Sequence, residues 1–196
     1  MMALTKKERE TLIILFKDFS SFYNANSISK VLKISHVGAQ KIFKRLLNEN
    51  LVVSKTIGKS IIYKLNLNET YACQLIAFLL ADEANNFKRW KEEFKELFKK
   101  DRIVMIFGSA VKDYVHAHDI DIIIVLENKD VKEVNKILRE KGEILPKELH
   151  AIKLNYRDLL DNLKNKDKVM VDIVKKAIIL CGQERYVGIL KNVASF

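Results

Sequence analysis

The stretch that decides the fold runs from Arg102 to Leu126 and reads RIVMIFGSAVKDYVHAHDIDIIIVL. The apolar run at 103–107 predicts a strand and Gly108-Ser109 predicts a turn, after which Asp119-Ile120-Asp121 opens a second strand. Because residues 122–126 form a nearly continuous β-branched run, the second strand is expected to be buried on both faces.

Two features of this stretch carry chemistry. Carboxylates at i and i+2 of a strand point to the same face, so Asp119 and Asp121 can hold a divalent cation together. At the end of the first strand, Gly108 and Ser109 can bring backbone N–H groups and a hydroxyl close to phosphate. The order Gly-Ser, nine residues, Asp-x-Asp resembles the nucleotidyltransferase superfamily that includes polymerase beta, and in particular its minimal nucleotidyltransferases.

This resemblance covers about residues 101–190 and implies an α/β domain with a mixed sheet. It implies transfer of a nucleoside monophosphate from an NTP to an acceptor, with Mg²⁺ held by oxygen ligands. Some members of the group adenylylate a partner toxin, so a protein acceptor is compatible with it. The implied site consists of the catalytic residues Asp119, Asp121 and Glu148, of which the two aspartates bind the metal, and the nucleotide-binding residues Gly108, Ser109 and Lys112.

The chain departs from the family pattern at three places. Members usually have an arginine soon after Gly-Ser and then a glycine, whereas residues 110–114 read AVKDY. Lys112 can supply a cation there, although it lacks the bidentate fork of arginine. His118 stands where the family often has serine, and the third carboxylate is uncertain: Glu148 is the candidate, with His150 two residues later on the same strand face.

The first 68 residues predict three helices and a hairpin. Helical spacing marks 5–19, a short helix that Asn26 or Ser27 can cap, and a third helix at 36–48 capped by Ser35. Strands at 51–55 and 60–66 follow, joined around Ile57-Gly58. This order resembles a winged helix-turn-helix domain, in which the third helix enters the major groove of DNA.

Charge supports a nucleic-acid partner for this domain. Residues 1–68 hold twelve Lys/Arg against four Asp/Glu, so about +8 of the chain's net charge of +10 lies in this segment. Double-stranded DNA is therefore the expected partner, and a protein–protein module is the alternative. The candidate contacts are His36, Gln40, Lys41, Lys44 and Arg45 on the third helix and Lys55 and Lys59 on the hairpin.

Residues 69–100 contain no Gly or Pro and predict one or two helices linking the domains. Apolar residues at 87, 90, 94 and 97 form a seam, which predicts either packing against the following domain or a dimer contact. We expect a homodimer, because two-fold operators suit winged-helix regulators.

The third segment, 101–196, continues with a helix at 130–141 ended by Gly142 and a strand at 148–154. Helices are predicted from Asn155 or Tyr156, at 168–180 and at 186–190. The three segments, 1–68, 69–100 and 101–196, give an α+β fold class: winged helix-turn-helix, linker helix and mixed-sheet transferase domain.

Other features of the sequence bear on membrane insertion, cellular location and metal binding. No apolar run is long enough for a membrane span, and MMALTKKERE lacks the apolar core of a secretory signal. Cys73 and Cys181 match no metal or redox spacing, which favours reduced thiols in a cytoplasmic protein. The cluster His116, His118 and Asp119 is an alternative transition-metal site.

Three functions fit these features. The first is a Mg²⁺-dependent nucleotidyltransferase that carries a DNA-binding module. The second is a transcriptional regulator whose transferase domain is catalytically degenerate or only senses a nucleotide. The third is a protein-interaction module that binds no nucleic acid.

Overall fold

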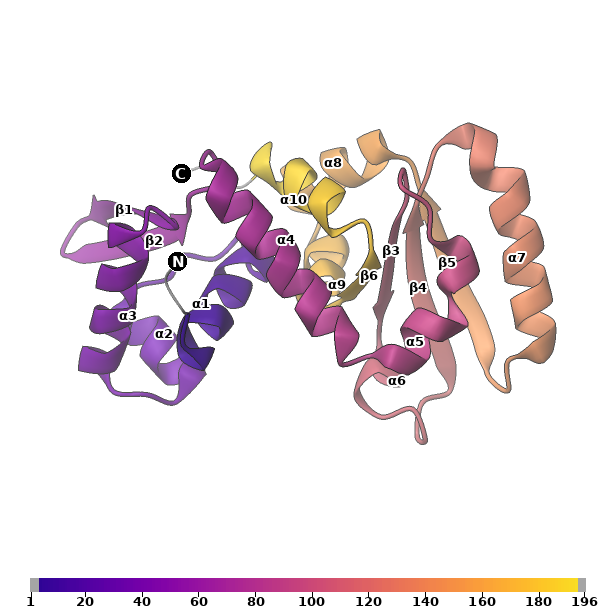
Figure 1. The fold of residues 1–196 in the computed structure, drawn as a ribbon, viewed down its shortest axis with the longest axis horizontal. Coiled ribbons are helices and arrows are strands. Elements are labelled where there is room, and N and C mark those ends of the chain that lie inside the picture. Colours follow the sequence, from indigo (N-terminus) through magenta and orange to yellow (C-terminus); the bar gives the residue numbers. More distant parts are fainter. Residues whose placement is uncertain (1–3, 194–196) are drawn as a thin grey trace. The chain divides into compact units, whose positions relative to one another are not determined.

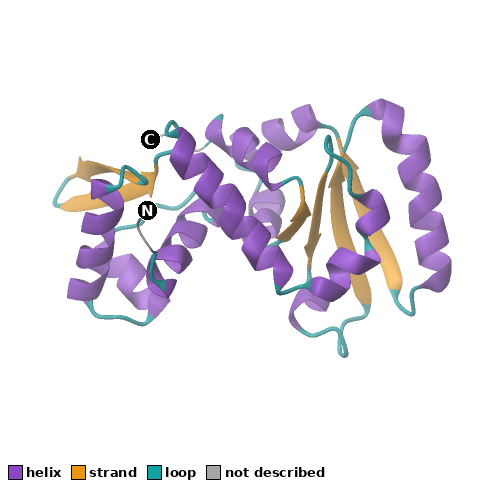
Figure 2. Ribbon diagram, viewed as in Figure 1, coloured by secondary structure: helices purple, strands orange, loops and turns teal. Residues whose placement is uncertain are grey.

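The computed structural model describes residues 4–193, and its helices and strands are drawn in Figures 1 and 2. The chain divides into two compact units between Leu79 and Leu80, within helix α4 (Thr70–Asn85). The α+β fold class predicted from the sequence is confirmed. Within residues 4–193, every helix is too short or too polar to cross a bilayer.

The first unit consists of three helices followed by a two-stranded hairpin, the element order predicted for a winged helix-turn-helix. Its elements are α1 (Lys6–Lys17), α2 (Ala25–Leu32), α3 (His36–Asn48), β1 (Val52–Ile57) and β2 (Ser60–Leu65). Ser35 caps α3 as predicted, since its hydroxyl accepts a hydrogen bond from the N–H of Gly38 at 3.0 Å. The prediction that Asn26 or Ser27 caps α2 is wrong, because Asn24 takes that place in a capping box with Ser27.

The hairpin is fixed to the third helix by aromatic packing. Phe43, fully buried on the inner face of α3, stacks on Tyr63 of β2 with ring centroids 3.8 Å apart. Strands β1 and β2 pair from Val52↔Leu65 to Ile57↔Ser60, so two residues form the tip. Gly58 takes a φ of 59° in this tip, which a glycine adopts without strain. The outer face of α3 and the hairpin are thereby presented on one rigid frame.

The second unit is built on a four-stranded sheet with the order β5-β4-β3-β6. Strand β3 is antiparallel to β4 and to β6, whereas β4 and β5 are parallel, so the sheet is mixed as predicted. The strands are β3 (Ile103–Phe107), β4 (Asp119–Val125), β5 (Glu148–Leu154) and β6 (Ile178–Cys181).

Helices cover the sheet (Figure 1). They are α5 (Lys88–Glu93), α6 (Ser109–Lys112), α7 (Val131–Ile144), α8 (Tyr156–Lys164), α9 (Lys168–Lys176) and α10 (Gln183–Lys191), with short 3₁₀ turns at Lys95–Leu97 and Asn128–Asp130. Two predicted boundaries are wrong. The helix expected over 168–180 ends at Lys176, after which the chain enters β6. Gly142 lies inside α7, which continues to Ile144, because Gly142 does not take the left-handed conformation that would end a helix.

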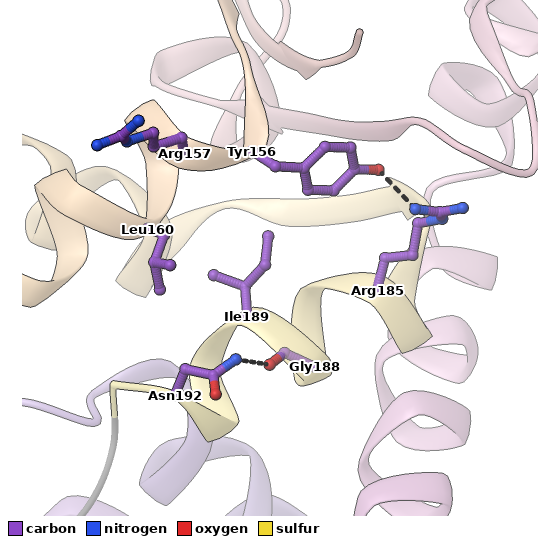
Figure 3. A pocket seen from close by; sticks show the side chains of 7 residues that line it. All are labelled: Tyr156, Arg157, Leu160, Arg185, Gly188, Ile189 and Asn192. Atoms are coloured by element: carbon purple, nitrogen blue, oxygen red, sulfur yellow. Dashed lines mark hydrogen bonds between the residues drawn. The ribbon is translucent and has the colours of Figure 1, made fainter.

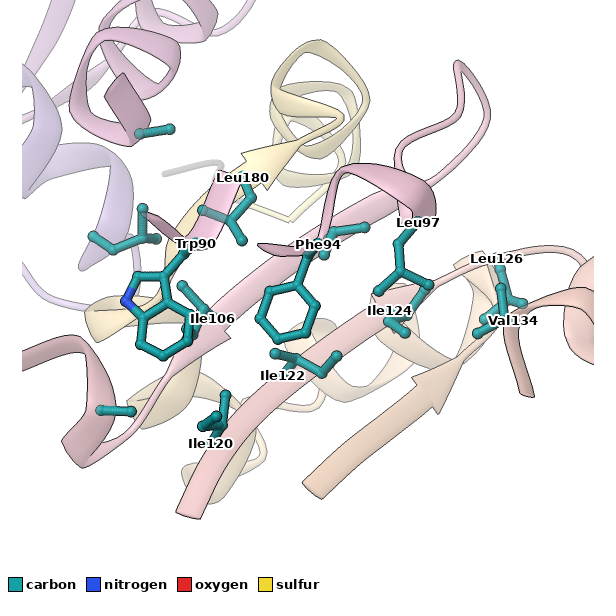
Figure 4. Packing of buried hydrophobic residues seen from close by; sticks show 14 of the residues in the cluster. Trp90, Phe94, Leu97, Ile106, Ile120, Ile122, Ile124, Leu126, Val134 and Leu180 are labelled. Carbon is teal, nitrogen blue, oxygen red and sulfur yellow. The ribbon is translucent and has the colours of Figure 1, made fainter. Parts of the chain in front are cut away.

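The apolar seam of residues 87–97 belongs to the core of the second unit (Figure 4). Trp90 is 4% exposed and Phe94 and Leu97 are fully buried. They pack against alternate residues of the sheet, among them Ile106, Ile120 and Ile122. The predicted core packing of the seam is therefore observed, and these side chains are not free to form a dimer contact. The linker itself is two helices, α4 and α5, rather than one.

Candidate active site

The side-chain alternation of β4 separates its core residues from its acidic ones. Ile120 and Ile122 lie in the core shared with Trp90, so Asp119 and Asp121 project from the opposite face of the strand. Their side chains are 35% and 23% exposed, respectively, and thus remain accessible from solvent. The sequence pattern that predicted two carboxylates on one face is realised at the first residues of β4.

Gly108 follows β3 and lies directly against Asp121. Its backbone angles, φ 79° and ψ −160°, fall in a region that is essentially restricted to glycine. A Cβ atom added to Gly108 would collide with the Asp121 carboxylate and lie 3.2 Å from its Cγ. Phe107, the residue before Gly108, pairs with Asp121 in the sheet, which fixes this close approach. A side chain at position 108 is therefore incompatible with the observed carboxylate position.

Ser109 and Lys112 open and close the single turn of α6. Both are exposed, so the hydroxyl and the ammonium group are accessible to a ligand. The sequence-predicted nucleotide-binding residues thus share one short segment with Gly108.

His150 brings a third metal-ligating group to the carboxylates. The parallel pairing of β5 with β4 sets Glu148 beside Asp119 and His150 beside Asp121. The Nδ1 atom of His150 lies 3.5 Å from Asp119 Oδ2 and 3.6 Å from Asp121 Oδ1. Ligand atoms of the three residues lie within 4.8 Å of one another, and this is the one such three-residue group among residues 4–193. The donor set fits a divalent metal ion.

Glu148, the predicted third carboxylate, lies outside this group. Its side chain is 79% exposed, and its Oε1 atom is 3.2 Å from Nε2 of His150. Glu148 thus contacts the ring nitrogen of His150 that points away from the aspartates. The sequence places Glu148 and His150 on one strand face, and the parallel register of the structure then sets Glu148 opposite Asp119 and His150 opposite Asp121.

The pKa values of Asp121 and His150 are both raised within this group. Burial, and next the negative charge of Asp119, raise the pKa of Asp121, whereas His150 opposes this rise. The hydrogen bond with Glu148 is the main cause that raises the pKa of His150, and both aspartates add to it. A protonated His150 therefore balances part of the negative charge of Asp119 and Asp121.

The segment between α6 and β4 is held by cations. Nζ of Lys147 donates to the carbonyls of Val115, at 3.1 Å, and Ala117. The ring centroid of Tyr114 lies 4.7 Å from Nζ of Lys147 and 3.5 Å from the guanidinium of Arg89. Two basic side chains thus fix the segment that joins Gly108-Ser109 to the aspartates.

The alternative metal site at His116, His118 and Asp119 is not assembled. His116 Nδ1 is instead 2.6 Å from Asp113 Oδ2, a contact that lowers the pKa of Asp113. The metal-ligating group of the described residues contains neither His116 nor His118.

The candidate DNA-binding residues are all exposed in the first unit: His36, Gln40, Lys41, Lys44, Arg45, Lys55 and Lys59. Arg45 differs from the others because its Nη1 atom pairs at 3.0 Å with Oε1 of Glu8, a carboxylate with a 1% exposed side chain. Arg45 therefore serves the packing of α3 on α1 as well as the surface.

A pocket of about 330 Å³ lies between α8 and α10, and none of its lining residues is a predicted site residue (Figure 3). Arg185 Nη1 donates to the hydroxyl of Tyr156 at 3.4 Å along one wall. The lining residues are Tyr156, Arg157, Leu160, Arg185, Gly188, Ile189 and Asn192.

Comparison with known proteins gives one family match, which lies in the second unit. Residues 92–186 match the family model described as Polymerase beta, Nucleotidyltransferase. None of the curated proteins matches the chain.

Solved structures give distant matches. The adhesin competence repressor AdcR from Streptococcus pyogenes is 14% identical, with 73% of this chain and 83% of that chain covered and a TM-score of 0.38. A cysteine-to-serine mutant of ZitR from Lactococcus lactis is 16% identical, with 74% and 77% covered and a TM-score of 0.35.

Proposed function

We propose that the chain is a metal-dependent nucleotidyltransferase that carries a DNA-binding winged helix-turn-helix. The observation that carries the enzymatic part is the contact of Gly108 with Asp121. It joins a turn suited to phosphate directly to a carboxylate suited to a metal ion. The family match over 92–186 supports the same reaction class.

The site residues have different roles in the proposed nucleotidyl transfer. Asp119 and Asp121 would hold a divalent ion, which when bound neutralises phosphate charge and lowers the pKa of an attacking hydroxyl. The absence of a side chain at Gly108 leaves room for the Asp121 carboxylate directly beside the turn. Backbone N–H groups of this turn and the Ser109 hydroxyl would donate to phosphate oxygens. Lys112 adds a cation for the triphosphate.

Calorimetry tests this proposal. ATP, GTP, CTP and UTP are titrated with Mg²⁺ and with Mn²⁺ into the wild type and Asp119→Ala/Asp121→Ala. Binding of at least one nucleotide that depends on the metal and is lost in the double variant is expected. The control Glu143→Ala/Asp172→Ala removes two exposed carboxylates of the same unit and should bind as the wild type does. Failure of all four nucleotides to bind would refute the proposal.

Turnover is measured separately. Labelled NTP and candidate acceptors, including protein and nucleic acid, are incubated with the full chain, and transfer of label is followed. Label transfer that requires Asp119 and Asp121 is expected. Nucleotide binding without transfer would favour the second candidate, a regulator that senses a nucleotide. The run AVKDY at 110–114, which lacks the arginine and glycine of the family pattern, is the observation that favours that candidate.

For the first unit we propose binding of double-stranded DNA through α3 and the hairpin. The support is the exposure of Lys41 on α3 and Lys59 at the hairpin tip, together with the basic charge of the unit. Removing one lysine that pairs with a phosphate should flatten the plot of log K against log salt by about one unit.

The DNA experiment uses mixed-sequence duplex and two double variants. Lys41→Ala/Lys59→Ala should weaken binding and reduce the salt slope by about two. Lys6→Ala/Lys30→Ala removes the same charge from α1 and α2, at positions that are not among the proposed contacts, and should retain the wild-type slope. Unchanged affinity and slope in the first variant would contradict this placement. Salt-insensitive binding to a protein instead would support an interaction module.

A homodimer is also proposed. Tyr71 and Phe78 are 43% and 62% exposed and lie seven residues apart on α4, hence on one side of the helix. Light scattering at micromolar concentration should give twice the mass of the chain, and a monomeric mass would refute this.

A further inference from the structure

The position facing both aspartates is occupied by an imidazole. Nδ1 of His150 lies at nearly equal distances, 3.5 and 3.6 Å, from oxygens of Asp119 and Asp121. Backbone pairing fixes this arrangement, because Asp121 and His150 are direct partners across parallel strands. The group is therefore a nitrogen and two carboxylates rather than three carboxylates.

Ligand type determines which metal such a group prefers. Mg²⁺ takes oxygen ligands and retains several waters, usually with one or two protein carboxylates. Imidazole nitrogen suits transition metals such as Fe²⁺, Ni²⁺ and Zn²⁺, whereas carboxylate and water ligands suit Mg²⁺. Replacing a carboxylate by an imidazole thus lowers the advantage of a hard cation and raises that of a borderline one.

The second ring nitrogen is already engaged by a carboxylate. Nε2 of His150 lies 3.2 Å from Oε1 of Glu148. Metal-binding histidines typically donate their other N–H to a carboxylate, which fixes the ring orientation and the tautomer and strengthens the ligand. With Nε2 occupied by Glu148, the free nitrogen of His150 is Nδ1, and Nδ1 is the atom that faces Asp119 and Asp121.

We propose that His150 is the third metal ligand of the site, oriented by Glu148, and that the site selects a transition-metal ion over Mg²⁺. This inference rests on the proposed metal site of the transferase, and it specifies which ion that site takes. Glu148 is a positioning residue in this arrangement and does not contact the metal.

The test uses the metal alone, without nucleotide, on the full chain. Zn²⁺ and Mg²⁺ are titrated calorimetrically into the wild type and His150→Asp, and the ratio of their dissociation constants is compared. A third carboxylate strengthens binding of any divalent ion, so the ratio is the informative quantity. We expect the preference for Zn²⁺ over Mg²⁺ to fall by about tenfold or more in His150→Asp. An unchanged ratio would overturn the proposal.

A spectroscopic readout identifies the ligand directly. Pulsed electron paramagnetic resonance of bound Mn²⁺ in protein labelled with ¹⁵N-histidine should detect nitrogen coupling in the wild type. The coupling should disappear in His150→Asp and persist in the control His116→Ala, whose side chain is 81% exposed and paired with Asp113. Coupling that persists in His150→Asp would overturn the proposal.

Glu148→Gln tests the positioning role with a mild change at an exposed side chain. Loss of such a partner typically weakens metal binding 10- to 100-fold, and the 79% exposure of Glu148 places the expected loss at about tenfold. Nitrogen coupling should remain, because His150 is still present. Unchanged Mn²⁺ affinity would overturn the role of Glu148.

The outcomes also separate this inference from the proposed function. Nitrogen-coupled Mn²⁺ without any metal-dependent nucleotide binding would refute the transferase and leave the metal assignment standing. Nucleotide binding with Mg²⁺ that is unaffected by His150→Asp, with an unchanged metal preference, would refute the metal assignment and leave the transferase standing.

Discussion

Replacing Gly108 with alanine tests the contact on which the candidate active site depends. The backbone at Gly108 adopts φ 79° and ψ −160°, a conformation that costs a residue with a Cβ about 1–3 kcal/mol. The new Cβ also collides with the carboxylate of Asp121, so that side chain must move as well. We expect the unfolding free energy of the second unit to fall by at least about 2 kcal/mol, which corresponds to a Tm lower by roughly 8 °C.

The same collision predicts a loss of metal binding. Asp121 can avoid the added methyl group only by leaving its position beside Asp119 and His150. Urea unfolding and Mn²⁺ calorimetry of the Gly108→Ala variant therefore measure one event in two ways. Stability and metal affinity should fall together, with at least a roughly tenfold weaker Kd for the ion if a single ligand is displaced.

Two glycines provide matched controls. Gly142 lies in α7 with nothing near its Cβ direction, so Gly142→Ala should raise stability by about 0.5–1 kcal/mol and leave metal binding intact. Gly58 has a φ of 59° in open space, so Gly58→Ala should show backbone strain of about 1–2 kcal/mol in the first unit alone. If Gly108→Ala keeps both wild-type stability and wild-type metal affinity, the inferred contact with Asp121 is wrong.

Three further predictions concern stability and reactivity. Asp130→Ala should lower the unfolding free energy measured in urea by about 3 kcal/mol, because the Asp130 variant leaves the fully buried guanidinium of Arg102 with fewer carboxylate partners. Arg102→Met removes that charge and should lower the unfolding free energy by less, so equal losses would contradict the reasoning. Trp90→Ala should cost about 3–5 kcal/mol in the same assay, since the 4% exposed ring packs in the core, and a loss below about 1 kcal/mol would refute that packing. Burial raises the pKa of Cys181, and only the thiolate reacts with an alkylating reagent. In a Cys73→Ser background, alkylation of Cys181 at about pH 8 should therefore be slower in the folded than in the unfolded chain, and it should accelerate as the pH rises. Equal rates in the folded and unfolded chain would refute this.

The sequence predicted those elements whose ends are marked by local chemistry. The third helix begins and ends as expected, because Ser35 caps it and Asn50 follows it in a left-handed conformation, with φ 55°. The strand 148–154 was predicted with its observed bounds, since Pro146 precedes it and Asn155 caps the helix that follows. In these segments, local propensity and tertiary structure agree.

The predictions that failed involve segments in which the sequence allows two structures. The apolar run at 177–180 suits a buried helix and a buried strand equally, and its pairing with β3 decides for the strand. Gly142 resembles a helix stop, but stopping depends on a left-handed turn that the chain does not make there. The first outcome depends on pairing with a strand far away in the sequence, which no local pattern contains.

In the candidate site, as in the fold, the residues specified by local sequence were predicted, and the role that depends on strand alignment was not. Gly108, Asp119 and Asp121 follow from one continuous stretch, in which turn and strand periodicity specify their directions. The role of His150 depends on how β5 is aligned with β4, and a shift of one residue would direct it to the other face. Composition and spacing cannot give that alignment, so Glu148 was the natural candidate for the third ligand.

The nature of the third ligand bears on whether the domain turns over. A site that had lost its function would be free to replace a metal ligand by a residue that cannot coordinate. Here the position facing Asp119 and Asp121 holds another good ligand, His150, and that ligand has a supporting carboxylate in Glu148. The pairing of His150 with Glu148 therefore favours a working metal site with a different ion over a degenerate one. In the proposed function, the lack of an arginine after Gly108-Ser109 would affect how a triphosphate is held and not which residues hold the metal.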